Sequence, residues 1–486
     1  MASLPPRVVL QQIAARVMIE RGMTPDFSPA AQSQLAAISG PARPPAAARD
    51  LRQLPWCSID NDESRDLDQL SVGEALADGG TRLLVAIADV ASLVPRGSAL
   101  DGHAEQNTTS VYTVARVYPM LPERLSTDLT SLNFEVDRAA VVVEMEFSGD
   151  GTLRRSGIYE AFVRNRARLA YNSVAAWLEE NAPPPAPLAA VPGLDENIRL
   201  QERMARQLRE RRHLRGALSF ETIQARPAFA GDVLKDIEPV TSNRAKRLIE
   251  DLMIAANGVT AGFLATRNIA SIRRVVRTPK RWDRIVELAA EHGVTLPPVA
   301  DAPALQKFLR AAKAKDPLRF PELSLSVIKL IGAGEYALEL PGGAGAGHFG
   351  LAVRDYAHST APNRRFPDLI TQRLVKAALA GQPTPYTTAD LDRLARHCTE
   401  QEDDAKKVER QVEKSAAALL LQGRIGETFD GLVTGASDKG TWVRLFHPPV
   451  EGKLERGPEY RKVGERLRVR LVHVDVERGF LDFRAT

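Results

Sequence analysis

The pattern of apolar and polar positions divides the chain into three regions of different character. Near the start, apolar residues recur at helical spacing over residues 6–21 and 29–38, with a turn around Gly22 and Pro25 between them. An Ala- and Pro-rich stretch, GPARPPAAARD, follows and is typical of a linker. Two short helices are compatible with a helix-turn-helix module and equally with packing against the next domain, so we assign them no chemistry.

The middle of the chain begins with short β-rich runs and continues with long helical patterns. Runs such as LLVAIADVASLV and AAVVVEMEF alternate with charged turns from Cys57 onward, and helical periodicity dominates between about 160 and 420. The proline-rich segment 182–193 and the glycine-rich segment 341–350 indicate surface loops inside this region. Strands followed by helices predict a mixed α/β core.

After Gly423 the pattern changes to short alternating strands. About 60 residues of this kind predict a small five-stranded barrel of the oligonucleotide-binding (OB) fold. Aromatic side chains beside basic ones offer stacking faces for bases, although Phe429 is equally expected in the barrel core. The residues concerned are Phe429, Trp442, Phe446, Lys439, Arg444 and Lys453.

Together these regions predict an α+β multidomain protein. Its expected parts are a small helical N-terminal module with a linker in residues 1–54, a mixed α/β domain in residues 55–422 and an OB-fold barrel in residues 423–486. The length of 486 residues agrees, because about 150 residues per domain is usual.

Composition excludes several classes of protein. Hydrophobic residues make up 44% of the chain and charged residues 26%, which argues against disorder or a collagen-like repeat. The two cysteines, Cys57 and Cys398, have no CxxC partners, so neither a thiol-bound zinc nor a disulfide framework is indicated. The first residues lack the pattern of a secretion signal, and no run of about 18 apolar residues occurs. We therefore expect a cytoplasmic protein that does not span a membrane.

The distribution of positive charge favours an anionic partner. The net charge is only +4, yet the sequence pI is about 9.0. Six arginines fall between Arg203 and Arg215 on an expected helix, and a second cluster runs from Arg267 to Arg281. Taken alone, such a cluster is more often a solvated helical face than a binding surface.

The segment SIDNDESRDLDQL at residues 58–70 carries the most chemistry. In an extended chain Asp66 and Asp68 point to one face and Leu67 to the other, while Asp60 returns across a tight loop. Carboxylates without histidine or thiolate suit magnesium or manganese, and a pair of such ions suits phosphodiester hydrolysis. Taken alone, an acidic segment is more often a solvated turn or a calcium-binding loop. The carboxylates are those of Asp60, Asp62, Glu63, Asp66 and Asp68.

The same segment resembles the signature of the RNase II/RNB family of exoribonucleases, roughly T-I-D, five residues, then D-x-D-D. Stretches at 97–133, 166–179, 247–258 and 348–374 also resemble family blocks, in family order. The resemblance implies a catalytic domain with RNA threaded into a narrow channel, its 3′ end at an acidic, magnesium-binding base. It also implies that the C-terminal barrel is an S1 domain that binds RNA.

By position, Asp60, Asp66 and Asp68 match three of the family's four active-site aspartates, which the resemblance makes catalytic residues and metal ligands. The fourth position is Gln69. An amide oxygen can coordinate magnesium but adds no negative charge. This departure implies that one ion binds more weakly or that a neighbouring carboxylate contributes.

Two adjacent arginines match a further family block, APNRRFPD. Arg364 matches the arginine that contacts the scissile phosphate, where paired donors offset transition-state charge. Arg365 is expected to support the RNA backbone. The alternative for Arg364 is a salt bridge to Asp368. Ala361 and Asn363 replace the usual serine and isoleucine of the block.

Three more residues match family positions that bind RNA. Tyr171 matches the tyrosine that stacks on the terminal base, and Glu250 matches the residue associated with the 3′ nucleotide and its ribose. Tyr112 matches an aromatic that grips RNA near the active site and helps to set the final product length. The alternatives are core tyrosines and a helix-surface carboxylate.

The combined interpretation is a monomeric, magnesium-dependent (or manganese-dependent) exoribonuclease that processively hydrolyses single-stranded RNA from a free 3′ end to 5′-mononucleotides. One alternative is an RNA-binding protein of the same family, silenced by Gln69. Another is a metal-dependent phosphatase or endonuclease. Only about 55 residues precede the acidic signature, too few for a cold-shock-like barrel with a linker. From this we expect an open entrance that admits duplex RNA with a 3′ overhang.

Overall fold

The computed structural model describes the chain except for a few short stretches. These are residues 1–3, 222–223, 231–232, 241, 318, 344, 438–439 and 456–463. Lys439, one of the basic residues expected beside the barrel aromatics, lies outside the described residues.

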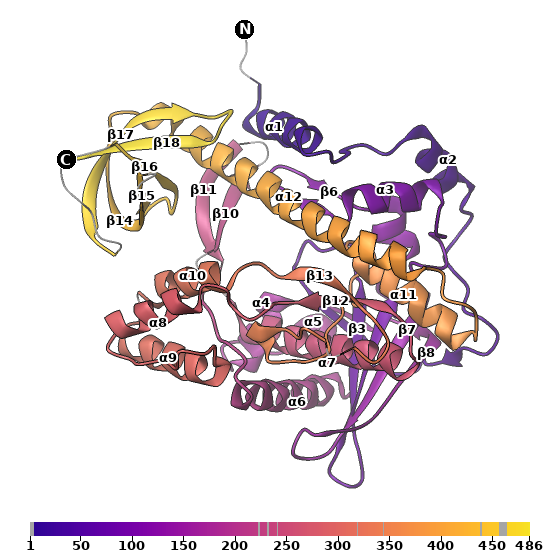
Figure 1. The fold of residues 1–486 in the computed structure, drawn as a ribbon. Helices are drawn as coiled ribbons and strands as arrows, with labels where there is room; N and C mark the ends of the chain where they lie inside the picture. The colour runs from indigo at the N-terminus through magenta and orange to yellow at the C-terminus, as the bar shows by residue number, and fades with distance from the viewer. Residues whose placement is uncertain are drawn as a thin grey trace.

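A seven-stranded, mainly antiparallel sheet forms the largest β-structure of the described chain, and several of its strands are seen at the lower right of Figure 1. Its central strands are rich in Val, Ile, Leu and Ala and are buried along most of their length, as expected for strands covered on both faces. Only the outer pairs β1–β8 and β2–β9 are parallel. The strands, in spatial order, are β1 (Arg49–Asp50), β8 (Leu153–Arg164), β7 (Asp137–Phe147), β4 (Thr81–Ala88), β3 (Gln69–Ala75), β2 (Cys57–Asp60) and β9 (Ala167–Ala170).

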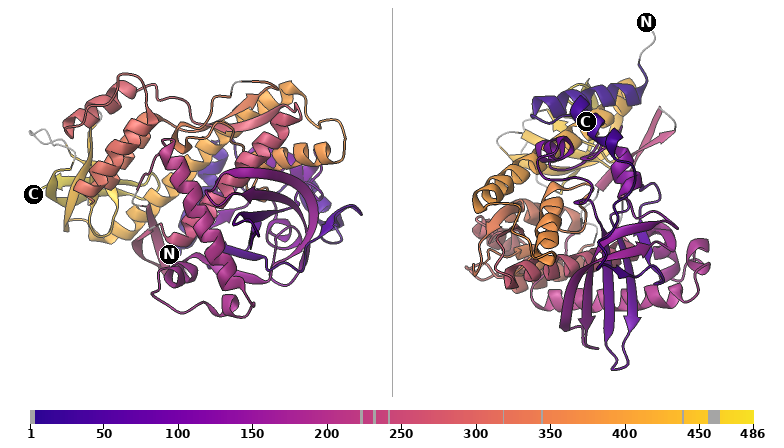
Figure 2. Two further views of the ribbon diagram at one scale, coloured as in Figure 1. Left: turned by 90° about the horizontal axis from the view of Figure 1, so that it is seen from below. Right: turned by 90° about the vertical axis from the view of Figure 1, so that its right-hand side faces the viewer.

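Helices cover this sheet (Figure 2). The helix α6 (Leu194–Leu214) packs on β3 and β4, and α7 (Arg244–Thr266) contacts β2, β4, β7 and β8. The remaining helices around the sheet are α3 (Ala99–Asn107), α4 (Tyr171–Leu178), α5 (Ala186–Ala189) and α11 (Phe366–Leu379). Side chains from the sheet and from these helices form one continuous core.

Among the described residues, α7 is the one helix long and apolar enough to cross a membrane by length and composition. Of its apolar window, 61% is buried inside the structure. Leu248, Leu252 and Leu264 are fully buried in the core that α7 shares with the sheet. A mostly buried core helix meets the same criteria as a membrane span, so the apolar composition of α7 is explained by its packing.

A smaller helical unit has a core of its own. The helices α8 (Trp282–Glu291), α9 (Ala302–Lys315) and α10 (Phe320–Ile331) bury Trp282, Ile285, Phe308 and Phe320 among them. Two small antiparallel sheets complete this part of the chain. One is the hairpin of β10 (Gln224–Ala230) and β11 (Val233–Val240), and the other pairs β12 (Ser271–Val275) with β13 (Glu335–Glu339), the strands that precede and follow the helical unit.

The two N-terminal helices predicted from the sequence are present as α1 (Pro6–Glu20) and α2 (Pro29–Ala37). Each begins with a proline in its first turn, where the missing N–H is not needed. The helix α1 packs on α12 (Thr388–Leu421), whereas α2 packs on α3. Their main contacts are therefore with the central part of the chain, as in the packing alternative.

The C-terminal barrel is closed, with strand order β14-β15-β16-β18-β17, which confirms the five-stranded OB-type fold. Its core contains Phe429, only 6% exposed, so the core alternative for this aromatic is correct. Phe446 is 50% exposed, while Arg444 pairs with Glu322 of α10 and is not free for RNA in this arrangement. The strands are β14 (Thr428–Ser437), β15 (Gly440–Leu445), β16 (Glu451–Leu454), β17 (Arg466–Asp475) and β18 (Phe480–Ala485).

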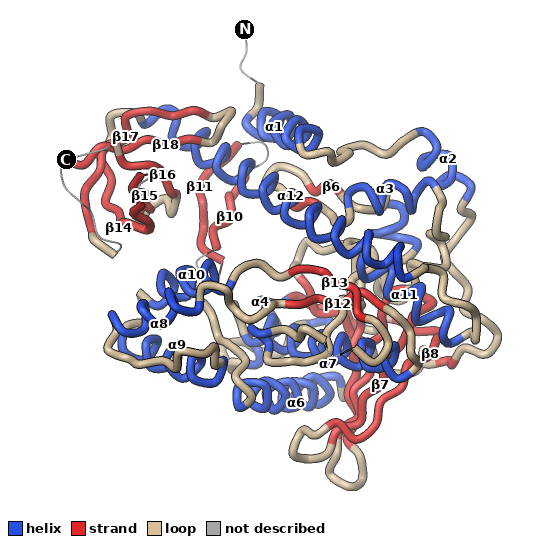
Figure 3. Tube along the Cα trace, viewed as in Figure 1, coloured by secondary structure: helices blue, strands red, loops and turns tan. Residues whose placement is uncertain are grey.

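The helix α12 joins the barrel to the rest of the molecule (Figure 3). It begins at Thr388, after a capping box in which Thr387 and Asp390 exchange hydrogen bonds. At its other end Ala418 and Leu421 are buried in the barrel core. One rigid element of 34 residues therefore links the barrel to the helices beside the sheet.

Candidate active site

The strands β2 and β9 set the position of Asp60. They run parallel, with Asp60 opposite Ala170, and Tyr171 follows directly as the first residue of α4. The aspartate and the tyrosine therefore lie at the same end of two neighbouring strands. Asp60 Oδ1 accepts a hydrogen bond from the N–H of Asn61 at 2.7 Å, which begins the loop to the remaining carboxylates.

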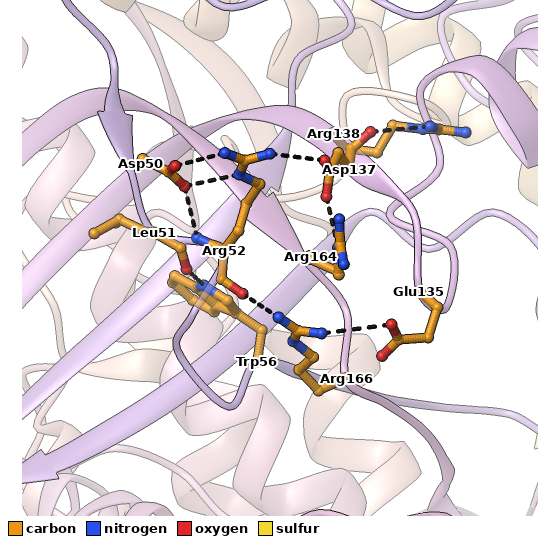
Figure 4. Close-up of polar contacts among 9 residues, drawn as sticks. All are labelled: Asp50, Leu51, Arg52, Trp56, Glu135, Asp137, Arg138, Arg164 and Arg166. Carbon is orange, nitrogen blue, oxygen red and sulfur yellow. Dashed lines mark hydrogen bonds and ion pairs between the residues drawn. The ribbon is translucent and has the colours of Figure 1, made fainter.

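A polar network fastens the other end of β2 and β9 (Figure 4). The N–H of Arg166 donates to the carbonyl of Trp56 at 2.8 Å, and its guanidinium donates to the carbonyl of Arg52 at 2.8 Å. Arg52 also pairs with Asp137 at 3.0 Å, and Asp137 accepts from Arg164 at 2.6 Å. The hydrogen bond from Arg164 lowers the pKa of Asp137, so the network stays charged near neutral pH. These contacts anchor the chain just before β2.

The segment after Asp60 folds back so that Leu67 points inward, as the alternation predicted. Leu67 is 3% exposed; its N–H donates to Ser131 Oγ at 2.9 Å, and its carbonyl accepts from Leu132 N–H at 3.0 Å. Asp66 and Asp68 flank it and take the opposite direction. The burial of Leu67 in the core therefore fixes the positions of Asp66 and Asp68.

Asp68 is the most deeply buried carboxylate of the group, with 2% exposure. Its Oδ1 accepts from the N–H of Asn363 at 3.1 Å, and its Oδ2 lies 3.3 Å from Arg364 Nε. That Oδ2 is buried and has no hydrogen-bond partner. Burial raises the pKa of Asp68 to about 7, against the opposing effect of Arg364.

Asp66 and Tyr112 form the open side of the group. Tyr112 Oη lies 3.5 Å from Asp66 Oδ2, and the tyrosine is 44% exposed. Burial raises the pKa of Asp66, Arg364 lowers it, and the charge of Asp60 raises it further. The backbone N–H of Tyr112 donates to Glu409 of α12 at 2.8 Å.

Arg364 belongs to the turn before α11, and this turn is tied to the Tyr112 strand. Its carbonyl accepts from the N–H of Ser110 at 3.0 Å and from Thr109 Oγ1 at 3.2 Å. The side chain keeps 40% of its surface exposed, so it can meet a ligand while contacting Asp68. A cavity of about 240 Å³ lies beside it, lined in part by Tyr112, Tyr336, His358, Arg365 and Glu402.

The ion pair considered for Arg364 is made by its neighbour instead. Arg365 pairs with Asp368 at 2.7 Å, and Asp368 is fully buried. Asp368 also accepts from the N–H of Ala361 at 2.9 Å and so closes the turn. Arg365 therefore shapes the loop that presents Arg364, besides lining the cavity.

Six of the predicted site residues thus share one neighbourhood. Arg364 lowers the pKa values of two carboxyls and two phenols, all of which burial raises, and Asp60 acts on Asp66 and Tyr171. Such effects require proximity. The six residues are Asp60, Asp66, Asp68, Tyr112, Tyr171 and Arg364.

Glu250 has other neighbours. It lies on α7 beside the buried Asp251. Desolvation raises the pKa of Glu250 and Asp251 adds to the rise, while Arg212 and Arg209 oppose it. The groups that act on it belong to α6 and α7, and the acidic segment is not among them. Asn243, the N-cap residue of α7, lies closer to this site, because its Nδ2 donates to the Tyr171 carbonyl oxygen at 3.5 Å.

The donor atoms are of the type that a hard cation prefers, but in this structure they are not close enough together to surround one. Asp68 Oδ2 is a buried carboxylate oxygen that accepts no hydrogen bond, and Asp60 and Asp66 add oxygen donors without nitrogen or sulfur. Gln69 is half-buried as the first residue of β3, paired with Ile87. Yet in the described part of the chain no three His, Cys, Asp or Glu side chains converge closely enough to hold a metal.

Sequence reasoning missed the residues that hold this group together. The backbone of Asn363 orients Asp68, and Thr130 Oγ1 donates to Asn363 Oδ1 at 2.5 Å. Tyr336 Oη lies 2.8 Å from His358 Nδ1 at the cavity wall. The departure from the family block at Asn363 was a usable signal, because a polar residue stands where an apolar one is usual. No pattern marked Tyr336.

Solved structures share this fold. Mycoplasma genitalium RNase R in complex with ribose methylated single-stranded RNA matches with a TM-score of 0.87 and 23% identity, over 99% of this chain and 78% of that one. Yeast Ssd1, described as a pseudonuclease, matches with a TM-score of 0.71 and 15% identity, over 91% of this chain and 55% of its own. At these identities the likeness shows the fold alone.

Curated relatives carry the name Ribonuclease R. The protein of Vibrio cholerae is 34% identical over 445 residues, covering 86% of this chain and 52% of the relative, and that of Aquifex aeolicus is 32% identical over 469 residues, covering 90% and 64%. The chain thus spans about half to two thirds of the length of these relatives. The RNB domain model matches residues 48–381, and the model of the RNase II-type exonuclease C-terminal S1 domain matches residues 427–486. The chain therefore belongs to the RNB domain family.

Proposed function

We propose that this protein is a 3′-to-5′ exoribonuclease that processively hydrolyses single-stranded RNA to 5′-mononucleotides and leaves a short oligonucleotide. The observation that carries the proposal is the buried Asp68, whose Oδ2 accepts no hydrogen bond and lies 3.3 Å from Nε of the half-exposed Arg364. A buried carboxylate against an exposed arginine suits a site that must hold both a cation and a phosphate. The names of the relatives point to the same activity.

Each residue of the group then has a role in hydrolysis. Arg364 binds the scissile phosphate and offsets the charge that grows on its oxygens. Asp60, Asp66 and Asp68 are the catalytic carboxylates and, with Gln69, the ligands for Mg²⁺, or for Mn²⁺ in its place. When bound, the divalent cation supplies an activated water and neutralises negative charge. Reaction by water requires no covalent enzyme intermediate.

Aromatic side chains hold the RNA without reading its sequence. Tyr112 is partly exposed beside Asp66, and Tyr171 lies next to Asp60, so both can stack on bases close to the cleaved bond. Arg365 supports the RNA backbone mainly indirectly, by stabilising the loop that presents Arg364. By the family resemblance, Glu250 contacts the 3′ nucleotide.

The proposed substrate is RNA with a free 3′ end, bound by a monomeric cytoplasmic protein. Structures of Mycoplasma genitalium RNase R contain single-stranded RNA in one case and double-stranded RNA in another. We extend this to the present chain as an ability to degrade a duplex that carries a 3′ overhang. Digestion of a hairpin with a short 3′ tail tests it, and a stall many nucleotides before the stem would count against it.

A labelled-RNA assay tests the main proposal. RNA labelled at its 5′ end is incubated with the protein and Mg²⁺, beside the same RNA with a blocked 3′ end and a reaction with chelator. We expect mononucleotides and a short labelled remnant only with a free 3′ end and metal. A shifted but intact RNA would instead establish the RNA-binding alternative associated with Gln69. Internal fragments or inorganic phosphate would establish an endonuclease or a phosphatase.

A further inference from the structure

The hairpin that carries Tyr112 is too short to be stable alone. Its strands β5 (Val111–Tyr112) and β6 (Val117–Tyr118) have two residues each and pair only with each other in the described structure. Even a longer two-stranded hairpin is marginally stable in water. The position of the Tyr112 ring must therefore be set by what packs against the hairpin.

One side of the hairpin is fixed close to the active site. The N–H of Ser110 donates to the carbonyl of Arg364, and the N–H of Tyr112 donates to Glu409 of α12. These bonds hold the β5 strand. The turn and β6, which runs back antiparallel to β5, make further contacts of their own.

The other side of the hairpin packs against α1. Tyr118 Oη donates to the carbonyl of Gln11 at 3.1 Å, and Gln11 Nε2 donates to the carbonyl of Ala115 at 3.4 Å. Apolar side chains of α1, the hairpin and α12 form a core separate from that of the sheet. Its members include Leu10, Ile13, Ala14 and Val17 of α1, Val111, Ala115 and Tyr118 of the hairpin, and Ala405, Val408 and Val412 of α12.

This packing gives α1 a specific role. Because its core is separate, the apolar face of α1 stabilises the hairpin and α12 and not the central sheet. The helix also touches the barrel, where Arg16 pairs with Glu477 at 2.9 Å. An element that contacts the hairpin, α12 and the barrel is well placed to fix Tyr112 relative to the rest of an RNA path.

We propose that α1 is a positioning element for Tyr112, and that its contacts with the β5–β6 hairpin determine how tightly the RNA is held near its 3′ end and how short the final oligonucleotide becomes. The inference rests on the proposed exoribonuclease function. Its physical basis is that the Tyr112 ring can stack only on RNA that is long enough to reach it, and that this stacking is effective only if the ring keeps a fixed position. The positioning residues are Ile13 and Tyr118.

The test compares two isoleucines of the same helix. Ile13 is 2% exposed in the hairpin core, whereas Ile19 is 63% exposed. We expect Ile13→Ala to raise KM on the order of fivefold, the lower end of what one stacking contact contributes, and to lengthen the final oligonucleotide while kcat is retained. Ile19→Ala should match the wild type, and Ile13→Val should have a KM and a product length close to those of the wild type. Tyr118→Phe, which keeps the ring and removes the bond to Gln11, should act in the same direction more weakly.

A double variant shows whether α1 acts through Tyr112. If it does, Ile13→Ala should add nothing to KM or product length in a Tyr112→Ala background. Additive effects would overturn the proposal, as would an Ile13→Ala protein that is less stable but has wild-type KM and product length.

Hydrogen exchange separates this proposal from the proposed function. In Ile13→Ala, amides of residues 111–118 should exchange faster, while those of β4 and β7 keep wild-type rates. Unchanged exchange in the hairpin would overturn the positioning role even in an active enzyme. Faster exchange in a protein that leaves RNA intact would show that the exoribonuclease function fails and that α1 still supports the hairpin.

Discussion

Asp68 and Arg364 come from segments almost 300 residues apart and meet with 3.3 Å between Oδ2 and Nε. The carboxylate is buried, and the guanidinium keeps 40% of its surface. Asp68 therefore lies inside the protein, while Arg364 remains accessible to a ligand. A buried charge costs stability unless it is paired, and strongly shifted carboxyls concentrate at functional sites.

Replacing Asp68 by Asn should abolish RNA hydrolysis and spare RNA binding. The change keeps the shape and an acceptor for the N–H of Asn363 but removes the negative charge that a cation requires. Single-turnover hydrolysis and a gel-shift titration measure the two properties separately. Hydrolysis at the wild-type rate would show that the metal site lies elsewhere.

Arg364→Lys should slow the chemical step by at least about a hundredfold, since loss of one well-placed donor to a transition-state oxyanion has that effect. Lysine keeps the charge but not the planar pair of donors. Arg365→Lys is the matched control. Its main expected effect is on stability, because the arginine pairs with the buried Asp368. The kcat of both variants and their urea midpoints distinguish the two roles.

The fold was predictable from the sequence wherever a local pattern sufficed. The helices near residues 6–21 and 29–38 and the closed C-terminal barrel all follow from periodicity and turn residues. The packing of α1 on α12 and on the Tyr112 hairpin depends on contacts between segments 100 to 400 residues apart. No local pattern encodes such contacts.

Within the candidate site, the sequence predicted the residue types and missed some partners. The alternation around Leu67 was correct, and Asp60, Asp66, Asp68 and Arg364 lie in one neighbourhood. Phe429 shows the limit of composition, because a buried barrel aromatic and a stacking platform look the same until burial is known. The assignment of the salt bridge to Arg365 also required the direction of each side chain at the start of α11.

Gln69→Asp should lower the Mg²⁺ concentration needed for half-maximal activity. The substitution adds a fourth carboxylate beside Asp68 at the position where the family has one, and carboxylates are preferred ligands for this ion. Without metal the added charge should cost stability by repulsion from Asp68. Gln69→Glu is the control, because it adds the same charge on a side chain one methylene longer. A magnesium dependence identical to the wild type would exclude Gln69 from the metal site.

Phe446→Ala should weaken RNA binding by about 1–3 kcal/mol if the barrel uses this ring for stacking. Phe446 is 50% exposed, and the Arg466 guanidinium lies 5.5 Å from its centroid. Phe480, which is 52% exposed in the same barrel, provides a matched control. Fluorescence anisotropy with a single-stranded RNA measures both. Equal losses in the two variants would indicate general destabilisation of the barrel.

The ionisation of Asp68 predicts how stability varies with pH in metal-free protein. Its pKa is raised from 3.8 to about 7, mainly by burial, so the folded state binds the proton more tightly than the unfolded state. The resulting stabilisation is complete below about pH 4 and is lost as pH rises through 7. At about 1.4 kcal/mol per pKa unit, the loss is on the order of 4 kcal/mol. Asp68→Asn should remove this dependence, which urea unfolding at pH 4 and pH 8 with a chelator measures. Excess Mg²⁺ should restore stability at pH 8 in the wild type alone, and an equal gain in Asp68→Asn would place the bound cation away from this carboxylate.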